Sequence, residues 1–394
     1  MKILYVHGSS KIEGIINALR RLKIEHEVYP VRILDTFTNE QEADKLAAYS
    51  RQNGITHLMS IHLIDTLAAA VQKAGINYIA LIWDAPYYKL FTTHGRMDNC
   101  WYSVFDRVEA RYFADAKIPH VLYQPLAVDD DQIREWDRQA GAFREYREEI
   151  CFVASLYDDN FYDEFCNNLP QNLQDYFVGL FENAAFRWDG VNRISGTVSN
   201  ELVAYIRAVT PGFQMVNFFD IPDSVYFENG YVTRKIANIE RICVLNMLAE
   251  KYPVTLYTTS KTAEYRLDNV KIMPPICSEQ DLHHVFQTSK INLNISLKGI
   301  EGGTPQRIMD ILGAGGFALT NYCAETADLF EEDKEIVMFR TPEELLDKVD
   351  YYLQHDRERE AIARNGHAKV MQYYTYTKKI KKLLAWAGGE GIRE

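Results

Sequence analysis

The sequence of 394 residues is poor in cysteine and in positive charge, and it has no long apolar run. Its six cysteines are scattered without a CxxC pair, so we expect free thiols in a reducing, cytoplasmic setting rather than disulfides or a zinc site. A formal net charge of −12 argues against nucleic acid as a general partner. The run Ile3–Val6 is too short for a signal peptide. No run reaches the roughly 18 residues of a membrane helix, so we expect no stable membrane anchor.

The sequence does have the length and the hydrophobic content for two domains. Hydrophobic residues make up 47% of it, including 25 tyrosines and 19 phenylalanines, which can fill two cores. In the first third, predicted strands alternate with predicted helices. The strands are expected over 2–7, 26–33, 56–61, 77–83 and 120–123, and the helices over 13–22, 40–53 and 65–74. Apolar strands separated by helices are typical of a parallel sheet covered on both faces.

The same alternation returns in the second half of the chain. Strands are predicted over 149–157, 254–259, 270–273, 291–296, 316–321 and 336–339, and helices over 129–149, 234–251 and 280–287. Thr341 is expected to cap a further helix, with Pro342 at its first position and Glu344 at its third. We therefore expect three parts: a Rossmann-like domain over 1–149, a second one over 150–376 with a helical insertion near 158–228, and a terminal helix over 377–394 that packs back across the seam.

Residues 302–316, GGTPQRIMDILGAGG, place glycine pairs on both sides of one short helix. Thr304 is expected as the N-cap and Pro305 as the first helical residue. The first turn of a helix has unpaired N–H groups and attracts anions. Gly302 and Gly303 lack the Cβ that would hold a phosphate away from the backbone. The segment is therefore a candidate phosphate-binding site.

Arg307 and Asp310 lie three residues apart, so both project from one face of this helix. A guanidinium can fork onto a diphosphate. A carboxylate one turn further along can accept two hydroxyl hydrogens from a ribose diol, and Lys298 adds a second cation before the loop. The pattern favours a nucleoside diphosphate across the helix start. Spacing alone equally allows an exposed ion pair between Arg307 and Asp310.

Two C-terminal stretches carry a family resemblance. They are INLNISLKGIEGGTPQRIMDILGAGGFALTNYCAETADLFEEDKEIVMF and YYLQHDREREAIARNGHAKV, and they resemble the glycosyltransferase-like module of the bacterial spore maturation protein CgeB family. The segments NYIALIWDAP, FVASLY and YQPLAVD resemble the N-terminal half of that family. The family is similar to the GT-B glycosyltransferases. The resemblance implies an α/β protein with two Rossmann-like parallel-sheet domains facing a central cleft.

The resemblance also implies roles for two acidic residues. Asp310 takes the place of the acidic residue that holds the donor ribose, and Glu301 lies near the first acid of the retaining GT-B pair. Glu301 and Asp310 are nine residues apart, whereas the family pair is eight apart and its second member is usually Glu. Whether transfer retains or inverts the sugar configuration therefore stays open.

Acceptor-side groups in such a fold are expected at the carboxyl ends of the N-terminal strands. His7, His62 and Asp84 have these positions, and an aromatic loop suited to a sugar face follows Asp84. Asp84 or His62 is the candidate catalytic base for an inverting transfer. The alternatives are a turn-capping aspartate and a histidine bonded to backbone. Asp129–Asp131 suits the start of a helix better than a metal site, so no metal is expected.

Together these features predict a metal-independent glycosyltransferase without a bound cofactor. The donor would be a nucleoside-diphosphate sugar, with a UDP-sugar as the first choice, and the acceptor a hydroxyl of a glycan, a protein or a small molecule. A nucleotide-sugar epimerase of the same fold is one alternative. A catalytically silent carbohydrate-binding or assembly protein is the other. The sequence specifies neither the base and sugar of the donor nor the acceptor, and it leaves the oligomeric state open.

Overall fold

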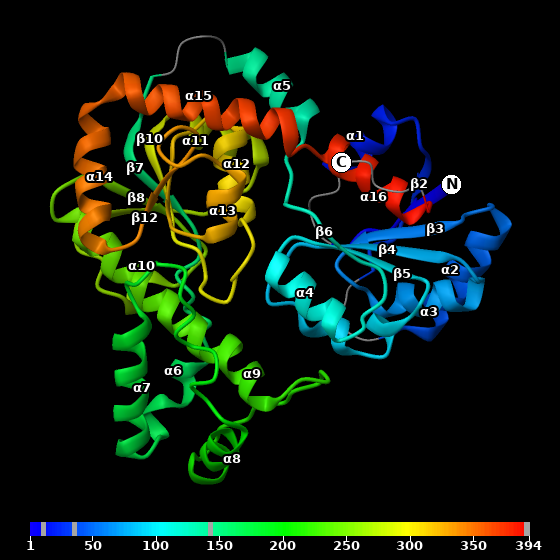
Figure 1. The fold of residues 1–394 in the computed structure, drawn as a ribbon, viewed down its shortest axis with the longest axis horizontal. Helices are drawn as coiled ribbons and strands as arrows, with labels where there is room; N and C mark the ends of the chain where they lie inside the picture. Colours follow the sequence, from blue (N-terminus) through cyan, green and yellow to red (C-terminus); the bar gives the residue numbers. More distant parts are fainter. Residues whose placement is uncertain (9–12, 34–37, 141–144, 390–394) are drawn as a thin grey trace. The chain divides into compact units, whose positions relative to one another are not determined.

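A computed structural model describes residues 1–8, 13–33, 38–140 and 145–389, and it divides the chain into two compact units (Figure 1). Unit 1 comprises Met1–Arg138, Gly302–Met309 and Val370–Glu394. Unit 2 comprises Gln139–Glu301 and Asp310–Lys369. The first segment of unit 1 thus ends before the seam predicted near residue 149, and two later segments of the chain return to it.

Unit 1 is built on a six-stranded parallel sheet. Its strands are β1 (Lys2–Tyr5), β2 (Glu25–Val28), β3 (His57–Ile61), β4 (Asn77–Ile82), β5 (Cys100–Val104) and β6 (Val121–Tyr123). The strand order is β2-β1-β3-β4-β5-β6, so the direction of winding reverses between β1 and β3. β3 is buried along its whole length because helices cover both faces of the sheet.

Helices pack on both faces of this sheet. They are α1 (Glu13–Arg21), α2 (Glu40–Gln52), α3 (Asp65–Ala74), η1 (Tyr88–Phe91), η2 (His94–Arg96), α4 (Arg107–Asp115), α5 (Asp130–Ala140) and α16 (Tyr376–Ala387). Figure 1 shows α1 and α16 together on one face and α2 and α3 on the other. The Tyr376 ring lies against Gly14, where any Cβ would approach it to 2.3 Å.

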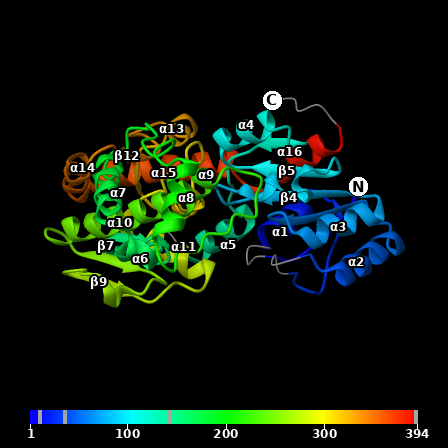
Figure 2. The same cartoon turned by 90° about the horizontal axis from the view of Figure 1, so that it is seen from below.

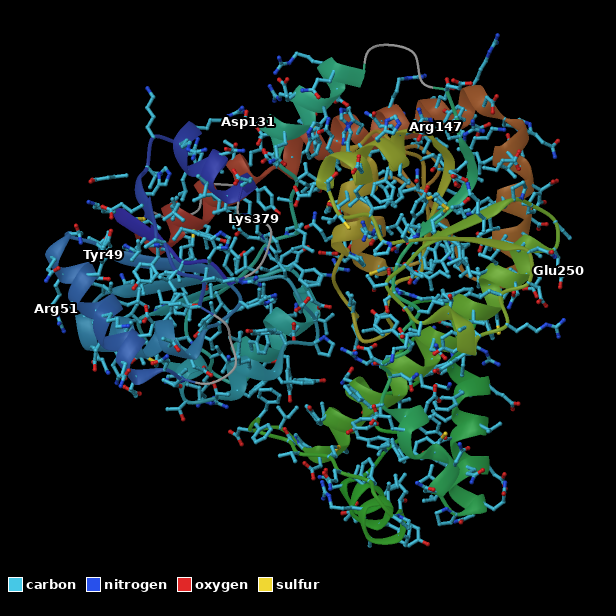
Figure 3. All side chains as sticks on the ribbon, turned by 180° about the vertical axis from the view of Figure 1, so that it is seen from behind. Tyr49, Arg51, Asp131, Arg147, Glu250 and Lys379 are labelled. Atoms are coloured by element: carbon cyan, nitrogen blue, oxygen red, sulfur yellow. The ribbon has the colours of Figure 1, made fainter. Side chains whose placement is uncertain are left out.

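The last helix of the described chain is anchored by a buried lysine. Lys379, labelled in Figure 3, is only 6% exposed. Its Nζ donates to the carbonyl oxygens of Gln124 (3.1 Å) and Pro125 (2.9 Å). α16 therefore belongs to unit 1 although it follows unit 2 in the sequence. Residues 390–394 of the predicted terminal helix lie outside the described residues.

Unit 2 also contains a six-stranded parallel sheet. Its strands are β7 (Glu148–Val153), β8 (Val254–Tyr257), β9 (Val270–Met273), β10 (Ser289–Asn294), β11 (Ala318–Asn321) and β12 (Val337–Phe339). The order β12-β11-β10-β7-β8-β9 reverses between β10 and β7. The surrounding helices are α10 (Thr233–Ala249), η5 (Thr262–Glu264), α11 (Glu279–Gln287), α13 (Ala324–Leu329), α14 (Pro342–Gln354) and α15 (Asp356–Tyr373). α14 packs beside β12 (Figures 1 and 2).

A helical lobe is inserted between β7 and α10. It contains α6 (Tyr162–Phe165), η3 (Cys166–Asn168), α7 (Gln171–Ala184), α8 (Asn200–Val209), α9 (Asp223–Phe227) and the π-helical turn η4 (Glu228–Val232). Figure 1 shows that α6 to α9 extend away from the sheet of unit 2. The lobe has its own core, in which the rings of Tyr162, Phe177 and Phe227 are buried. The helices can therefore stay folded although they are remote from the sheet.

The predicted α/β fold class is confirmed, with corrections to single elements. The predicted strand over 26–33 ends at Val28, and the helix predicted over 129–149 ends at Ala140, with 141–144 outside the described residues. No element was predicted over 84–119, where β5 and α4 lie. Within the described ranges, no helix is both long and apolar enough to span a bilayer.

Candidate functional site

The reversal of strand order in unit 1 brings His7 and His62 to neighbouring strand ends, because they follow β1 and β3. Such reversals are the usual ligand-binding positions of doubly wound sheets. His62 adopts a left-handed backbone conformation with φ of 61°. Two buried hydroxyls hold that turn: Ser60 Oγ and Tyr78 Oη donate to the His62 carbonyl oxygen at 2.8 and 3.1 Å.

His62 and Asp84 lie together in the structure. Asp84 follows β4, which neighbours β3, and its Oδ2 is 3.2 Å from His62 Nε2. The His62 ring stacks on Tyr87, with centroids 5.2 Å apart. Asp84 is mostly exposed, whereas the His62 side chain is 23% exposed. An accessible carboxylate paired with an imidazole is an arrangement that can accept a proton from a hydroxyl group.

Glu109, in the first turn of α4, lies behind this pair and was not among the predicted residues. One carboxyl oxygen of Glu109 accepts the N–H of Tyr87, and the other is buried with no hydrogen-bond partner among the described residues. Burial raises the pKa of Glu109 to about 8, and the negative charges of Asp106 and Asp84 add to the rise. Glu109 is therefore largely protonated at neutral pH. It holds the backbone of Tyr87, the residue that stacks on His62.

Gly302 and Gly303 pack against the start of α4 within unit 1. The Gly302 N–H donates to Asp106 Oδ2 (2.9 Å), and the Gly302 carbonyl accepts from the Arg107 N–H (2.8 Å). A Cβ on Gly303 would lie 2.6 Å from the Phe105 ring. The backbone freedom expected to admit a phosphate is thus used, at Gly302 and Gly303, for close contact with another part of the chain.

The winding of unit 2 reverses between β7 and β10, and Arg241 from α10 joins the carboxyl ends of these strands. Its two terminal nitrogens donate to the carbonyl oxygens of Ser155 and Ile295, each at 2.5 Å. The guanidinium also lies over the Tyr157 ring, 4.5 Å from its centroid. Arg241 is 7% exposed, and its hydrogen bonds hold the loops that follow β7 and β10. A ligand-binding edge of this sheet would be built from these loops.

Lys298, the predicted second cation, has a buried acidic partner. Its Nζ lies 3.2 Å from Glu240 Oε1 and donates to the Arg187 carbonyl oxygen at 2.8 Å. Glu240 is completely buried, and its Oε1 also accepts the Phe186 N–H. Burial raises the pKa of Glu240, and the Lys298 ammonium counteracts that rise. Lys298 therefore compensates a buried carboxylate, a role that the sequence did not indicate.

The helix α12 (Gln306–Gly313) begins in unit 1 and ends in unit 2. It starts at Gln306, so the prediction of Thr304 as N-cap and Pro305 as first helical residue was wrong. Its buried side chains are those of Ile308, Met309, Ile311 and Leu312, as 3.6-residue periodicity requires. Arg307 and Asp310 remain partly exposed, Thr304 is buried, and Glu301 is exposed. Arg307 and Asp310 thus lie on the polar side of the helix.

Asp129–Asp131 lies at the start of α5, as expected from the sequence. Asp129 Oδ1 accepts the backbone N–H groups of Asp131 and Gln132 at 3.0 and 3.2 Å. Arg21 pairs with both Asp130 and Asp131, and Figure 3 labels Asp131. These carboxylates therefore cap the helix start and bind Arg21, Asn17 and Thr377. Among the described residues, no group of three or more His, Cys, Asp or Glu side chains is placed to hold a metal ion.

Comparison with known structures identifies the fold. Sucrose-phosphate synthase from Thermosynechococcus elongatus superposes with a TM-score of 0.53 at 8% identity, over 99% of this chain and 100% of that one. Anabaena HepE in complex with UDP and glucose gives a TM-score of 0.52 at 12% identity, over 98% and 100%. This is the GT-B fold. A Rickettsia africae glycosyltransferase gives a TM-score of 0.50 at 8% identity, over 99% of this chain and 98% of that one.

Sequence comparison adds a family match to part of this GT-B chain. A family model described as "Glycosyl transferase-like" matches residues 241–385. The matched segment contains Lys298, Glu301 and all of α12. No curated protein matches the sequence significantly. The match therefore falls on the segment that carries the predicted donor-binding residues.

Sequence reasoning missed Asp106 and Glu109 in unit 1, as it missed Glu240 and Arg241 in unit 2. The spacing Asp106-x-x-Glu109 is that of a capping box and could have predicted the start of α4. Asp106 does cap this helix, accepting the N–H groups of Val108 and Glu109 at 2.8 and 3.0 Å. The contacts of Asp106 with Gly302 and of Glu109 with Tyr87 come from tertiary packing. No local pattern indicates them.

Proposed function

We propose that the protein is a glycosyltransferase that takes its sugar from a nucleoside-diphosphate donor, with a UDP-sugar as the first choice. The observation that carries the proposal is the family match, which spans α12 in a chain with the GT-B fold. HepE, which shares this fold, has been captured with UDP and glucose and with UDP-glucose. These facts support the class of donor and leave the acceptor open.

Arg307 and Asp310 are the donor-binding residues in this proposal. Both are partly exposed on the polar side of α12, one turn apart. The Arg307 guanidinium would fork onto the diphosphate and stabilise the leaving group, and the Asp310 carboxylate would accept the ribose hydroxyls. Because the Gly302 N–H is bonded to Asp106, we do not count it among the phosphate-binding groups. The Gly303 and Thr304 backbone and the exposed Glu301 stay candidates for contact with the donor.

Charge on the departing diphosphate would be neutralised by protein groups alone. Arg307 supplies a cation, the start of α12 supplies a partial positive charge, and Lys298 adds positive potential although it is paired with Glu240. A metal ion would then be unnecessary. Metal independence is thus part of the proposal.

Asp84 and His62 are the proposed acceptor-activating groups. Asp84 is accessible, and its carboxylate lies within 3.2 Å of His62 Nε2, so either group could take the proton while the other stabilises the product charge. Glu109 positions this pair indirectly by holding the Tyr87 backbone. This role applies to transfer with inversion of the sugar configuration, in which a side chain of the enzyme deprotonates the acceptor hydroxyl.

A two-stage experiment tests the proposal. Thermal shifts with UDP, ADP, GDP and CDP would identify the donor base, because a ligand at 100 times its Kd stabilises by about 2.7 kcal/mol. The matching nucleotide-sugars are then incubated with the protein and candidate acceptors. Nucleoside diphosphate released together with a glycosylated acceptor is the expected result. An altered free sugar would indicate an epimerase, and binding without turnover a silent binding protein.

A further inference from the structure

A pocket whose lining includes several charged side chains lies at the amino ends of β10 and β11 in unit 2. It measures about 610 Å³, which is within the size range of small-molecule sites. Its walls come from the starts of β10 and β11 and from α15; the lining includes Tyr146, Lys290, Gly316, Arg359, Glu360 and Arg364. Lys298 and α12 follow the other end of β10. Six residues of extended strand separate the two edges by roughly 20 Å.

Arg359 is the unusual residue of this pocket. It is 1% exposed, and its Nη1 donates to the Tyr352 carbonyl oxygen at 2.6 Å and lies 2.7 Å from Asp356 Oδ1. Its Nε and Nη2 are buried without a hydrogen-bond partner among the described residues, and the guanidinium carbon lies over the Tyr146 ring, 5.1 Å from its centroid. These two nitrogens carry parallel N–H bonds on one edge of the guanidinium. Two oxygens of a carboxylate or a phosphate can accept both hydrogen bonds at once.

Further cations come from two of the pocket walls, Lys290 from β10 and Arg364 from α15. Lys290 and Arg364 line the pocket together with Arg359, and Glu360 is the acidic residue among the lining side chains. Their acidic neighbours are at long range: Lys290 Nζ lies 3.8 Å from Glu149, and Arg364 Nη1 lies 3.9 Å from Glu360. Such pairs contribute little and can be exchanged for a better-placed anion. In a protein of net charge −12, this is a local concentration of positive groups.

We propose that this pocket binds a small phosphate ester of the size of a sugar phosphate. The phosphate would pair with the Nε–Nη2 edge of Arg359 and with Lys290 and Arg364. Glu360 would accept a hydroxyl of the organic part. A dianionic phosphate suits a lining with three cations better than a single carboxylate does. The site is separate from the donor site and does not depend on the proposed transfer reaction.

Calorimetry with the full-length protein tests the proposal, using inorganic phosphate and glucose 1-phosphate at matched ionic strength. Both probes are expected to bind with one-to-one stoichiometry, glucose 1-phosphate more tightly. The double variant Lys290→Ala/Arg364→Ala should weaken binding tenfold or more, since bonds to charged groups are lost. Arg357→Ala is the matched control, because Arg357 is exposed on the same helix and does not line the pocket. It should bind like the wild type.

Two further variants separate the pocket from the donor site and from folding effects. Arg307→Ala should leave glucose 1-phosphate binding unchanged, and the double variant should leave UDP binding unchanged. Arg359→Met should abolish phosphate binding. If this variant fails to fold, the double variant Lys290→Ala/Arg364→Ala still tests the proposal. Absence of saturable binding would overturn the proposal. Affinity unchanged in the double variant, or lost in Arg307→Ala, would overturn it equally.

Discussion

Glu109→Gln is the substitution that most directly probes the electrostatics behind the His62–Asp84 pair. Glutamine keeps the oxygen that accepts the Tyr87 N–H, and it mimics the protonated carboxyl that burial favours. The variant removes only the ability to become charged. We expect it to fold at pH 6, and its stability advantage over the wild type should grow between pH 6 and pH 8.

The magnitude follows from the difference between the folded and unfolded pKa values. The unfolded chain releases the Glu109 proton near pH 4.3, as a free glutamate does. Each unit by which the folded and unfolded pKa values differ corresponds to about 1.36 kcal/mol of stability. The folded protein holds this proton to a pKa of about 8. Between these values the unfolded state binds fewer protons, so stability falls as pH rises. From pH 6 to pH 8 the wild type should lose at most about 2.7 kcal/mol that Glu109→Gln retains.

Hydrogen exchange measured on peptides from β5 and α4 would report this difference, after correction for the intrinsic pH dependence of exchange. Glu13→Gln is the matched control, because Glu13 is an exposed first-turn glutamate of α1 in the same unit. Its stability should follow the pH profile of the wild type. If Glu109→Gln loses stability from pH 6 to pH 8 as steeply as the wild type, Glu109 is already charged at neutral pH and the reasoning fails.

Three further predictions concern the other candidate residues. Asp84→Asn should lower kcat about a hundredfold with UDP affinity unchanged, and a nearly unchanged kcat would make Asp84 a turn residue. Lys298→Met should destabilise unit 2 by about 3–5 kcal/mol, because it leaves Glu240 buried without its cation; hydrogen exchange in β10 measures this, and wild-type protection would disprove the pairing. Transfer activity should survive EDTA, and loss with EDTA that manganese restores would contradict the metal-independent mechanism.

Local sequence patterns predicted the parts of the fold that local chemistry decides. Thr341 was expected to cap α14, and its Oγ1 accepts the Glu344 N–H at 3.2 Å. A helix was expected over 65–74, and α3 covers these residues and ends at Gly75, whose φ is 71°. The apolar runs likewise placed most strands to within a few residues. These features depend on residues that are close in sequence, so the sequence carries the information.

The candidate site was less predictable because distant residues build it. Gly302 was expected to meet a phosphate, yet its N–H is taken by Asp106, 196 residues away in the sequence. Lys298 was predicted as a second cation for the diphosphate, but in the structure it pairs with Glu240 of α10. Glu109 could be recognised as part of a helix start, whereas its raised pKa results from burial in the folded protein, which outweighs the lowering by the Tyr87 N–H. Pairing and burial of this kind are set by tertiary packing.

The central claim is that α12 binds the diphosphate of a nucleotide donor through Arg307, and calorimetric titration with UDP tests it most directly. Arg307→Ala should weaken UDP binding by about 1.5–3 kcal/mol, and Arg307→Lys should restore part of that loss, because lysine supplies the charge without the fork. Wild-type UDP affinity in both variants, with hydrogen exchange showing an intact fold, would contradict the claim and leave Arg307 as a surface residue of the helix.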